Sequence, residues 1–236
     1  KRDYMDKHYK LWQSRDIIDK YLNKNVSDYF DSEIYFIKRI SLDIRSILDV
    51  GCACGRLIEL FHLYNKEIVY TGMDLSMESV QNARKLYPQS IFVNANALEY
   101  STQKTFDLVN ATGVCQHEPQ FEKLVQKMID LSGKYILFDV KLAAIKEHLI
   151  NINVAYSNNE SPIYFNILSL NKLISFLKKL ENISRISIYG YVTAKNAKNV
   201  IPGDMGELVS AGILLEKASP GFVGVPELHI EVPKFL

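Results

Sequence analysis

One short segment of the sequence combines residue types that could hold a ligand close to the backbone. The segment SILDVGCACGRLIEL (46–60) closes an apolar run at Asp49, passes through a turn from Gly51 to Gly55, and starts a helical pattern near Arg56. Glycine has no side chain and tolerates unusual dihedral angles, so a ligand can approach such a turn closely. The following helix adds free N–H groups at its amino terminus. A tight strand–helix turn that binds nothing is the alternative.

A carboxylate stands at the end of the next apolar run. Asp74 lies in YTGMDLSMESVQNAR, and a carboxylate at this place can accept hydrogen bonds from both hydroxyls of a ribose. The alternative is an N-cap for the following helix, but Ser76 is better placed for that role. The turn and the carboxylate together predict a nucleoside site.

These features resemble the first motif of class I S-adenosylmethionine-dependent methyltransferases, an acidic residue followed by x, Gly, x, Gly, x, Gly. The chain keeps Asp49, Gly51 and Gly55 and has Ala53 in the middle, where one methyl group is expected to fit if the local dihedral angles are ordinary. The resemblance extends over residues 46–140. It implies S-adenosylmethionine as cofactor, S-adenosylhomocysteine as product, and a Rossmann-like α/β fold of seven strands, the last antiparallel, with helices on both faces.

The resemblance also assigns cofactor contacts further along the chain. Asn96 stands where the family often has an acidic residue facing the adenine amine, and its carboxamide oxygen could accept the same hydrogen bond, unless it is an ordinary turn residue. Segment 110–114 would line the methionine half of the cofactor. The predicted cofactor-binding residues are Tyr9, Trp12, Arg15, Asp49, Gly51, Cys52, Ala53, Gly55, Asp74, Leu75, Asn96, Ala97, Leu98, Ala111, Thr112 and Gly113.

The acceptor is expected beyond the carboxyl edge of the fourth strand, where His117 lies. A neutral imidazole there could remove a proton from an attacking hydroxyl, although a solvated or structural histidine is the alternative. Gln116 beside it, with Tyr156 and Tyr164 from a tyrosine-rich stretch, is predicted to contact the acceptor.

The amino-terminal segment carries aromatic residues at helical spacing. Tyr9 and Trp12 are three apart and share a helix face, so they could simply anchor the helix to the sheet. In the family that the sequence resembles, such a segment folds over the cofactor. We therefore expect a lid, with Arg15 as a partner for the cofactor carboxylate.

The elements that must position these residues alternate between strand and helix. This spacing predicts a parallel sheet covered on both faces. The expected strands are 46–50, 67–73, 90–95, 106–112 and 134–140, and the expected helices between them are 57–64, 77–86 and 121–131.

One domain is expected, with a helical cap (1–45), a cofactor-binding core (46–140) and an acceptor-side insertion with a carboxyl-terminal strand pair (141–236). Within this last part, the pattern predicts a helix over 141–150, a loop with the tyrosine-rich stretch, and a helix over 170–180. Strands 183–195 and 207–218 would form an antiparallel pair, and the tail 219–236 would be irregular.

Composition excludes several classes of protein and site. The 236 residues include 28 Lys+Arg against 27 Asp+Glu, so neither nucleic acid nor membrane is an expected partner. The apolar runs are too short for a membrane helix, the start lacks a secretory signal, and three cysteines suggest a reduced, cytoplasmic protein. The sequence Cys52-x-Cys54 lacks further ligands, so no metal is expected. Arg56 occupies the third small-residue position of a nicotinamide dinucleotide motif and disfavours that fold.

The expected activity is methyl transfer (EC 2.1.1.-) to a small molecule, namely O-methylation of a sugar or of a sugar- or nucleotide-linked phosphate derivative. The Ile-, Lys- and Asn-rich composition is typical of AT-rich bacterial genomes, in which compact methyltransferases modify capsule carbohydrates, including phosphoramidate groups. The alternatives are a protein or RNA methyltransferase and a cofactor-binding regulatory protein without transferase activity.

Overall fold

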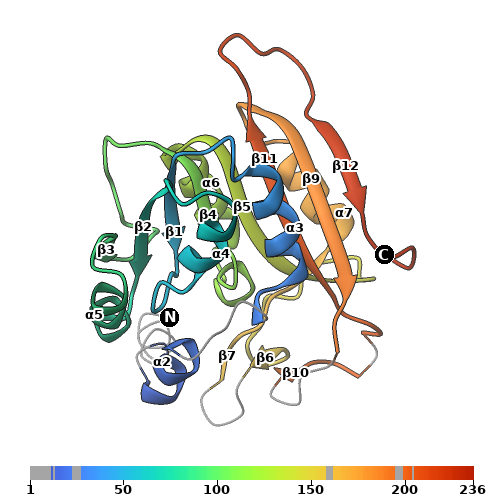
Figure 1. Ribbon diagram of the computed structural model, residues 1–236. Helices are drawn as coiled ribbons and strands as arrows, with labels where there is room; N and C mark the ends of the chain where they lie inside the picture. Colours follow the sequence, from blue (N-terminus) through green and yellow to red (C-terminus); the bar gives the residue numbers. More distant parts are fainter. Residues whose placement is uncertain (1–11, 13, 23–27, 158–161, 195–198, 204) are drawn as a thin grey trace.

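The computed structural model describes residues 12, 14–22, 28–157, 162–194, 199–203 and 205–236 (Figure 1). Its central sheet has the core order β3-β2-β1-β4-β5-β11-β9. The first five of these strands run parallel, and β11 is antiparallel to both of its neighbours. This confirms the predicted Rossmann-like architecture. The strands are β1 (Ser46–Val50), β2 (Val69–Asp74), β3 (Ile91–Asn94), β4 (Phe106–Ala111), β5 (Ser132–Ala143), β9 (Ile183–Val192) and β11 (Val209–Lys217).

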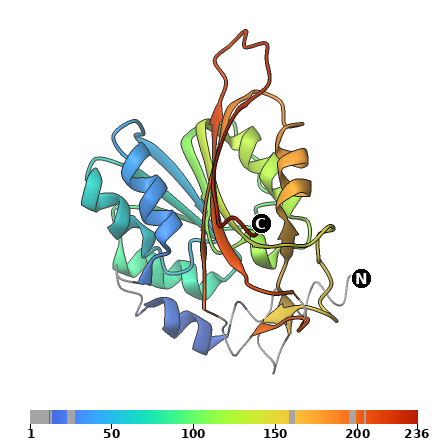
Figure 2. The same ribbon diagram turned by 90° about the vertical axis from the view of Figure 1, so that its right-hand side faces the viewer.

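Helices cover both faces of the sheet (Figure 2). One face packs against α3, α4 and α5, and the opposite face packs against α6 and α7. The helix α2 lies beside the carboxyl ends of the first strands (Figure 1). The bounds are α2 (Arg15–Leu22), α3 (Asp31–Ile40), α4 (Leu57–Tyr64), α5 (Met77–Leu86), α6 (Phe121–Leu131) and α7 (Leu170–Leu177). Within the described ranges, no helix is long and apolar enough to cross a membrane.

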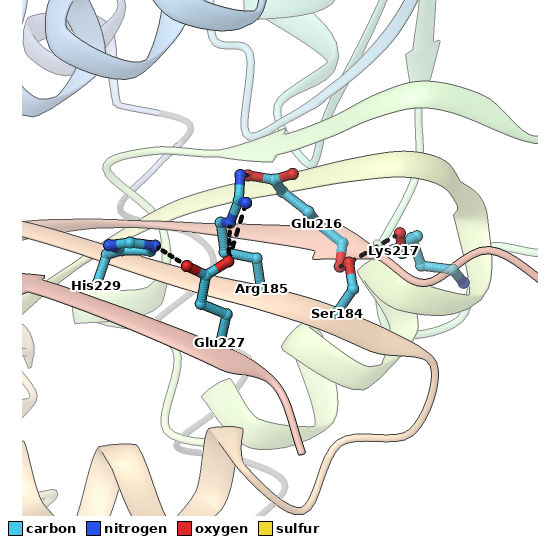
Figure 3. Close-up of polar contacts among 6 residues, drawn as sticks. All are labelled: Ser184, Arg185, Glu216, Lys217, Glu227 and His229. Carbon is cyan, nitrogen blue, oxygen red and sulfur yellow. Dashed lines mark hydrogen bonds and ion pairs between the residues drawn. The ribbon is translucent and has the colours of Figure 1, made fainter. Parts of the chain in front are cut away.

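The tail forms a strand, so the prediction of an irregular tail is wrong. Strand β12 (Glu227–Glu231) pairs parallel with β9 at the edge of the sheet. Arg185 of β9 contacts both Glu216 of β11 and Glu227 of β12, at 3.2 and 2.9 Å, and His229 also contacts Glu227 (Figure 3). Polar and apolar residues alternate in this segment, and Leu228 packs partly buried against the core, whereas Ile230 is 40% exposed. This alternation is a strand signal that the prolines around it obscured.

The predicted helix over 141–150 is also wrong, because β5 continues through Ala143. Its pairing with β11 extends to Val209 opposite Leu142, and β8 (Ile167–Ser169) pairs with its end. Side chains in this stretch alternate between the core and the other face, as in a strand. A small second sheet follows, formed by β6 (Tyr156–Ser157), β7 (Ile163–Tyr164) and β10 (Asn199–Val200).

The face under α3 and α4 changes character along the strands. Toward the amino ends it is apolar, with Ile47, Leu108 and Leu137 packed against the helices. Two residues further along the same strands, on the same face, it carries Asp49, Asn110 and Asp139, all buried. The opposite face stays apolar over its whole length. Burying polar groups costs free energy unless they are hydrogen-bonded. Apolar packing therefore does not explain this polar layer.

Candidate functional site

The turn between β1 and α4 needs glycine at two positions. Gly51 and Gly55 have φ values of +71° and +77°, which favour glycine. A Cβ atom on Gly51 would lie 2.4 Å from Val114 Cγ2, and one on Gly55 would lie 2.8 Å from the Phe92 ring. These glycines therefore let the turn pack against β3 and the end of β4, a requirement that exists without any ligand.

Ala53 occupies a left-handed conformation, with φ +47°. The condition under which its methyl group was expected to fit, ordinary dihedral angles, is therefore not met. This conformation costs an L-residue about 1–2 kcal/mol. It directs the Ala53 N–H toward the Asp74 carboxylate, 2.8 Å from Oδ2, so the turn after β1 is joined to the end of β2.

Replacing Ala53 by glycine is expected to raise the free energy of unfolding by up to about 1 kcal/mol. Removing the strain stabilises the folded state, and the greater conformational freedom of glycine in the unfolded chain offsets part of that gain. Ala53→Val should lower it, because a β-branched side chain fits this region worse. Urea denaturation of the two variants measures both signs. A glycine variant less stable than the native chain would contradict the strain.

Asp74 is oriented by backbone N–H groups and is not the N-cap of α5. Its Oδ1 accepts a hydrogen bond from Ser76 N and its Oδ2 accepts one from Ala53 N, both at 2.8 Å. Burial raises the pKa of this carboxyl above 3.8, and the backbone donors oppose that rise. Ser76 is the N-cap of α5, accepting from Ser79 N. The carboxylate is thus oriented by the backbone and retains acceptor capacity for a ligand.

Asp49 belongs to a buried chain of hydrogen bonds. It accepts from the Tyr70 hydroxyl and, at 2.7 Å, from Asn110 Nδ2. Asn110 Nδ2 also donates to Thr112 Oγ1, and Thr112 donates to Glu33 Oε1 at 2.7 Å. Burial, followed by the charge of Asp49, raises the pKa of Tyr70 well above 10. This chain joins β1, β2 and β4 to α3.

Glu33 was missed by the sequence analysis. Its other oxygen accepts from Phe30 N at 2.7 Å, as in a capping box, and its side chain is buried. The N-cap position is Phe30, so the sequence lacks the Ser or Thr of a complete capping box, and the other partner, Thr112, lies far along the chain.

The predicted adenine side is built as a turn. Asn96 Oδ1 accepts from Leu98 N at 3.0 Å, and the carbonyl oxygen of Asn96 accepts from Tyr100 N at 2.9 Å. Ala97 and Leu98 pack partly buried against the main core. Asn94, another residue that the sequence analysis missed, donates to the carbonyl oxygens of Asp74 and Leu75 at 3.0 and 2.9 Å. The end of β3 is thereby tied to the end of β2.

Three of the predicted acceptor-side residues meet around one short turn. His117 lies in the 3₁₀ turn η2 (Cys115–His117), with its Nδ1 2.7 Å from the Tyr164 carbonyl oxygen. A carbonyl oxygen only accepts, so Nδ1 carries the proton and Nε2 is left as the basic nitrogen. Gln116 Nε2 donates to that Nε2 at 3.2 Å, so an acceptor hydroxyl would have to replace this donor. The Trp12 ring lies 5.1 Å from the imidazole, centroid to centroid.

Asn166 holds this turn in place, and it was not singled out from the sequence. Its Nδ2 donates to the carbonyl oxygens of Cys115 and Glu118, at 2.9 and 2.7 Å, and its N–H donates to the Gln116 carbonyl oxygen. Tyr156 faces Tyr164 across the β6–β7 pair. The insertion after β5 thus supplies both the acceptor-side tyrosines and the support of the histidine.

The helix α2 covers the turn after β1. Cys54 Sγ lies 3.8 Å from the Ile18 carbonyl oxygen. Arg15, on the same helix, is 78% exposed and contacts Asp19 and Glu78, at 3.8 and 3.7 Å. Tyr9, the other predicted lid aromatic, lies outside the described residues.

Tyr21 of α2 is a further residue that the sequence analysis missed. Burial raises its pKa to about 12, and the charges of Asp74, Glu33 and Asp139 add to the rise. Its phenol therefore lies within electrostatic range of the carboxylates of β2, α3 and β5.

Between α2 and α5, beside Ser76, a cavity of about 530 Å³ opens.

Asp139 supports the turn after β4. It is 2% exposed, and its Oδ1 accepts from Gly113 N at 2.6 Å. Burial raises its pKa to about 6, against the opposing effects of Lys141 and the Gly113 N–H. The sequence shows a charged residue within the apolar run KYILFDV, but it does not show which residues contact it.

The raised pKa of Asp139 predicts a pH-dependent stability. Between pH 4 and 6 the native state holds a proton that the unfolded chain has released, so the free energy of unfolding falls as pH rises, by ~3 kcal/mol, and then levels off. Asp139→Asn should lack this fall, whereas the exposed Asp130→Asn should keep it. Denaturation from pH 4 to 8 measures the difference, and parallel curves for Asp139→Asn and the native chain would rule out the assignment.

The cysteines do not form a metal centre with other side chains in the part of the chain that the structure describes. Cys52, Cys54 and Cys115 are buried free thiols, and burial raises the pKa of each above 9. Among these described residues, no three His, Cys, Asp or Glu side chains come together as a metal ion would need.

Comparisons with known proteins point to one family. Residues 47–132 match the family model described as a methyltransferase domain. The trans-aconitate 2-methyltransferase of Escherichia coli O1:K1 / APEC is 29% identical over 99 residues, which cover 42% of this chain and 39% of that protein. The chain thus matches about two fifths of the length of this relative.

Solved structures share the fold over most of the chain. The plantazolicin methyltransferase BpumL, in complex with S-adenosylhomocysteine and a desmethyl analogue, has a TM-score of 0.60 and 15% identity, covering 92% of this chain and 98% of that one. The amino-terminal domain of EvdMO1, solved in the presence of S-adenosylhomocysteine and D-fucose, has a TM-score of 0.59 and 12% identity, covering 80% and 84%. At such identities the likeness concerns the fold.

Proposed function

We propose that the protein transfers a methyl group from S-adenosylmethionine to a small-molecule acceptor. The chain has the class I S-adenosylmethionine-dependent methyltransferase fold, and residues 47–132 match the methyltransferase domain family. The observation that carries this proposal is the hydrogen bonding between the turn after β1 and Asp74 at the end of β2. The N–H groups of Ala53, which has a left-handed conformation, and of Ser76 donate to the Asp74 carboxylate and fix its orientation.

The residues present suit this cofactor. An ionised carboxylate has about four acceptor positions, so Asp74 can bind a ribose diol while it keeps its two backbone donors. As the resemblance implies, we expect Leu75 and Leu98 to supply apolar contacts to the adenine and the Ala97 N–H to donate to its ring nitrogen. A Cβ atom on Gly113 would meet open space, so the backbone after β4 can be approached closely.

The chemistry asks little of the protein beyond position and a base. When bound, the cofactor supplies a methyl group that its sulfonium already activates. Correct placement of the two reactants lowers the barrier by up to ~7–11 kcal/mol. His117 Nε2 accepts the proton of an acceptor hydroxyl as the new O–CH₃ bond forms, and the Tyr164 carbonyl oxygen, which accepts from Nδ1–H, holds the ring in that tautomer.

We infer that the acceptor atom is an oxygen, and that the acceptor is a sugar or a sugar- or nucleotide-linked phosphate derivative, such as a bacterial capsule precursor. The basic nitrogen of His117 supports an oxygen, because an amine or thiolate would need it less. The buried Gln116 Oε1 has no hydrogen-bond partner among the described residues, so it can accept from a second hydroxyl. The D-fucose present with the structural relative adds support for a sugar.

Calorimetry and a transfer assay test the proposal. The purified chain is titrated with S-adenosylmethionine and S-adenosylhomocysteine, then incubated with methyl-labelled cofactor and a panel of sugars, sugar phosphates, nucleotide sugars, carboxylic acids and amines. Binding of both cofactor forms and transfer to hydroxyls is the expected result. Lack of cofactor binding would overturn the whole proposal, and transfer to amines alone would overturn the oxygen and sugar assignments.

A further inference from the structure

Strand β5 extends beyond the carboxyl end of the neighbouring strand β4. We call the extending residues, 139–143, the wall. Strand β4 ends at Ala111, opposite Phe138, whereas β5 continues to Ala143. On the α3 side of this wall, Lys141 follows Asp139 and lies opposite Ser210 of β11. Asp139 contacts Gly113 N, so the wall adjoins the turn that leads to His117. We expect the acceptor beyond the carboxyl end of β4, next to this turn.

The ammonium of Lys141 is buried with donors to spare. The residue is 9% exposed, and its Nζ donates to Ser210 Oγ and lies 5.4 Å from the centroid of the Phe30 ring. Among the described residues, Ser210 is its one hydrogen-bond acceptor, so two of its three N–H groups are unused. Burial lowers its pKa, and the charge of Asp139 opposes that effect. A buried cation with unused donors is costly, and an anion would remove that cost.

The carboxylates of the same polar layer are already engaged. Asp139 accepts from Gly113 N, and Glu33 accepts from Phe30 N and Thr112 Oγ1. Lys141 is the cationic group beside these carboxylates, and its two unused N–H groups can donate to an anion. The Ser210 hydroxyl, which accepts from Lys141, in turn donates to Thr193 Oγ1 at 3.4 Å. An ammonium beside a hydroxyl suits a carboxylate or a phosphate group.

We propose that Lys141 binds an anionic group of the methyl acceptor, a carboxylate or a phosphate, above the carboxyl end of β4. The inference rests on the proposed function and narrows its substrate class to acids and phosphate esters. It makes Lys141 a specificity-determining residue for the acceptor.

Binding of charged and uncharged probes to the protein loaded with S-adenosylhomocysteine tests this. The pairs are trans-aconitate with its trimethyl ester, and D-glucose 6-phosphate with D-glucose, measured by calorimetry. We expect one anion or both to bind, with the uncharged counterpart weaker by about tenfold or more. Equal binding within each pair, or no binding of either anion to the loaded protein, would overturn the proposal. Failure of S-adenosylhomocysteine itself to bind would instead overturn the proposed function.

Two substitutions locate the effect. Lys141→Met should weaken the binding of the anion about tenfold or more and leave the affinity for S-adenosylhomocysteine unchanged. The matched control is Lys217→Met, at the other end of β11, where Lys217 Nζ donates to the Ile129 carbonyl oxygen. This variant should bind the anion as the native chain does. An unchanged anion affinity in Lys141→Met would refute the assignment. Should that variant not fold, Lys141→Arg and the paired probes on the native chain decide the question.

Discussion

Replacing Asp74 by alanine is expected to weaken the binding of S-adenosylmethionine by about 10²–10⁴-fold. A hydrogen bond to a charged acceptor contributes about 1.5–3 kcal/mol, and a ribose diol would lose two of them. The substitution also removes the acceptor of the Ala53 N–H, which donates to Asp74 Oδ2 at 2.8 Å in the native chain. Calorimetric titration with the cofactor measures the change.

Two companion variants separate binding from local structure. Asp74→Asn keeps the size and one oxygen, so it should fold like the native chain and bind with intermediate affinity. Glu78→Ala removes a nearby carboxylate that contacts Arg15 on the surface, and it should change the dissociation constant less than twofold. If Asp74→Ala bound the cofactor as tightly as the native chain, the ribose would have to lie elsewhere and the proposed function would lose its main support.

Replacing His117 by alanine is expected to lower kcat for a hydroxyl acceptor by about 10²–10⁴-fold, the usual contribution of a general base. Cofactor affinity should stay unchanged, because the residue contacts the Tyr164 carbonyl oxygen and Gln116 on the acceptor side. Single-turnover transfer from labelled cofactor measures the chemical step directly.

His229→Ala is the matched control, since this histidine lies on the surface of β12, paired with Glu227 (Figure 3). It should transfer methyl groups at the native rate. A normal rate in His117→Ala with a hydroxyl acceptor would exclude the general base and leave positioning as the whole of catalysis. A loss confined to KM would instead indicate that His117 only binds the acceptor.

Local pattern was enough to predict the order of the main strands and helices from residue 46 to 140. Strand and helix periodicity is a property of neighbouring residues, and the turn at Gly51–Gly55 and the carboxylate of Asp74 each follow a strand directly. After residue 140 the local pattern located α7 and the antiparallel pair of β9 and β11, but it failed at the start and at the end of this part of the chain. There, β5 is lengthened by pairing with β11 and β8, and the tail becomes a strand because β9 offers it an edge.

By itself, then, the sequence determined the Rossmann-like core, the glycine turn and the acidic end of β2, because each depends on residues close together in the chain. Only the tertiary structure decided that Ala53 is strained, that Glu33 meets Thr112, that Asp139 holds Gly113, and that a backbone carbonyl selects the tautomer of His117. These contacts join residues that lie far apart in the chain. Sheet order and register bring them together, and neither is written in the spacing of any one segment.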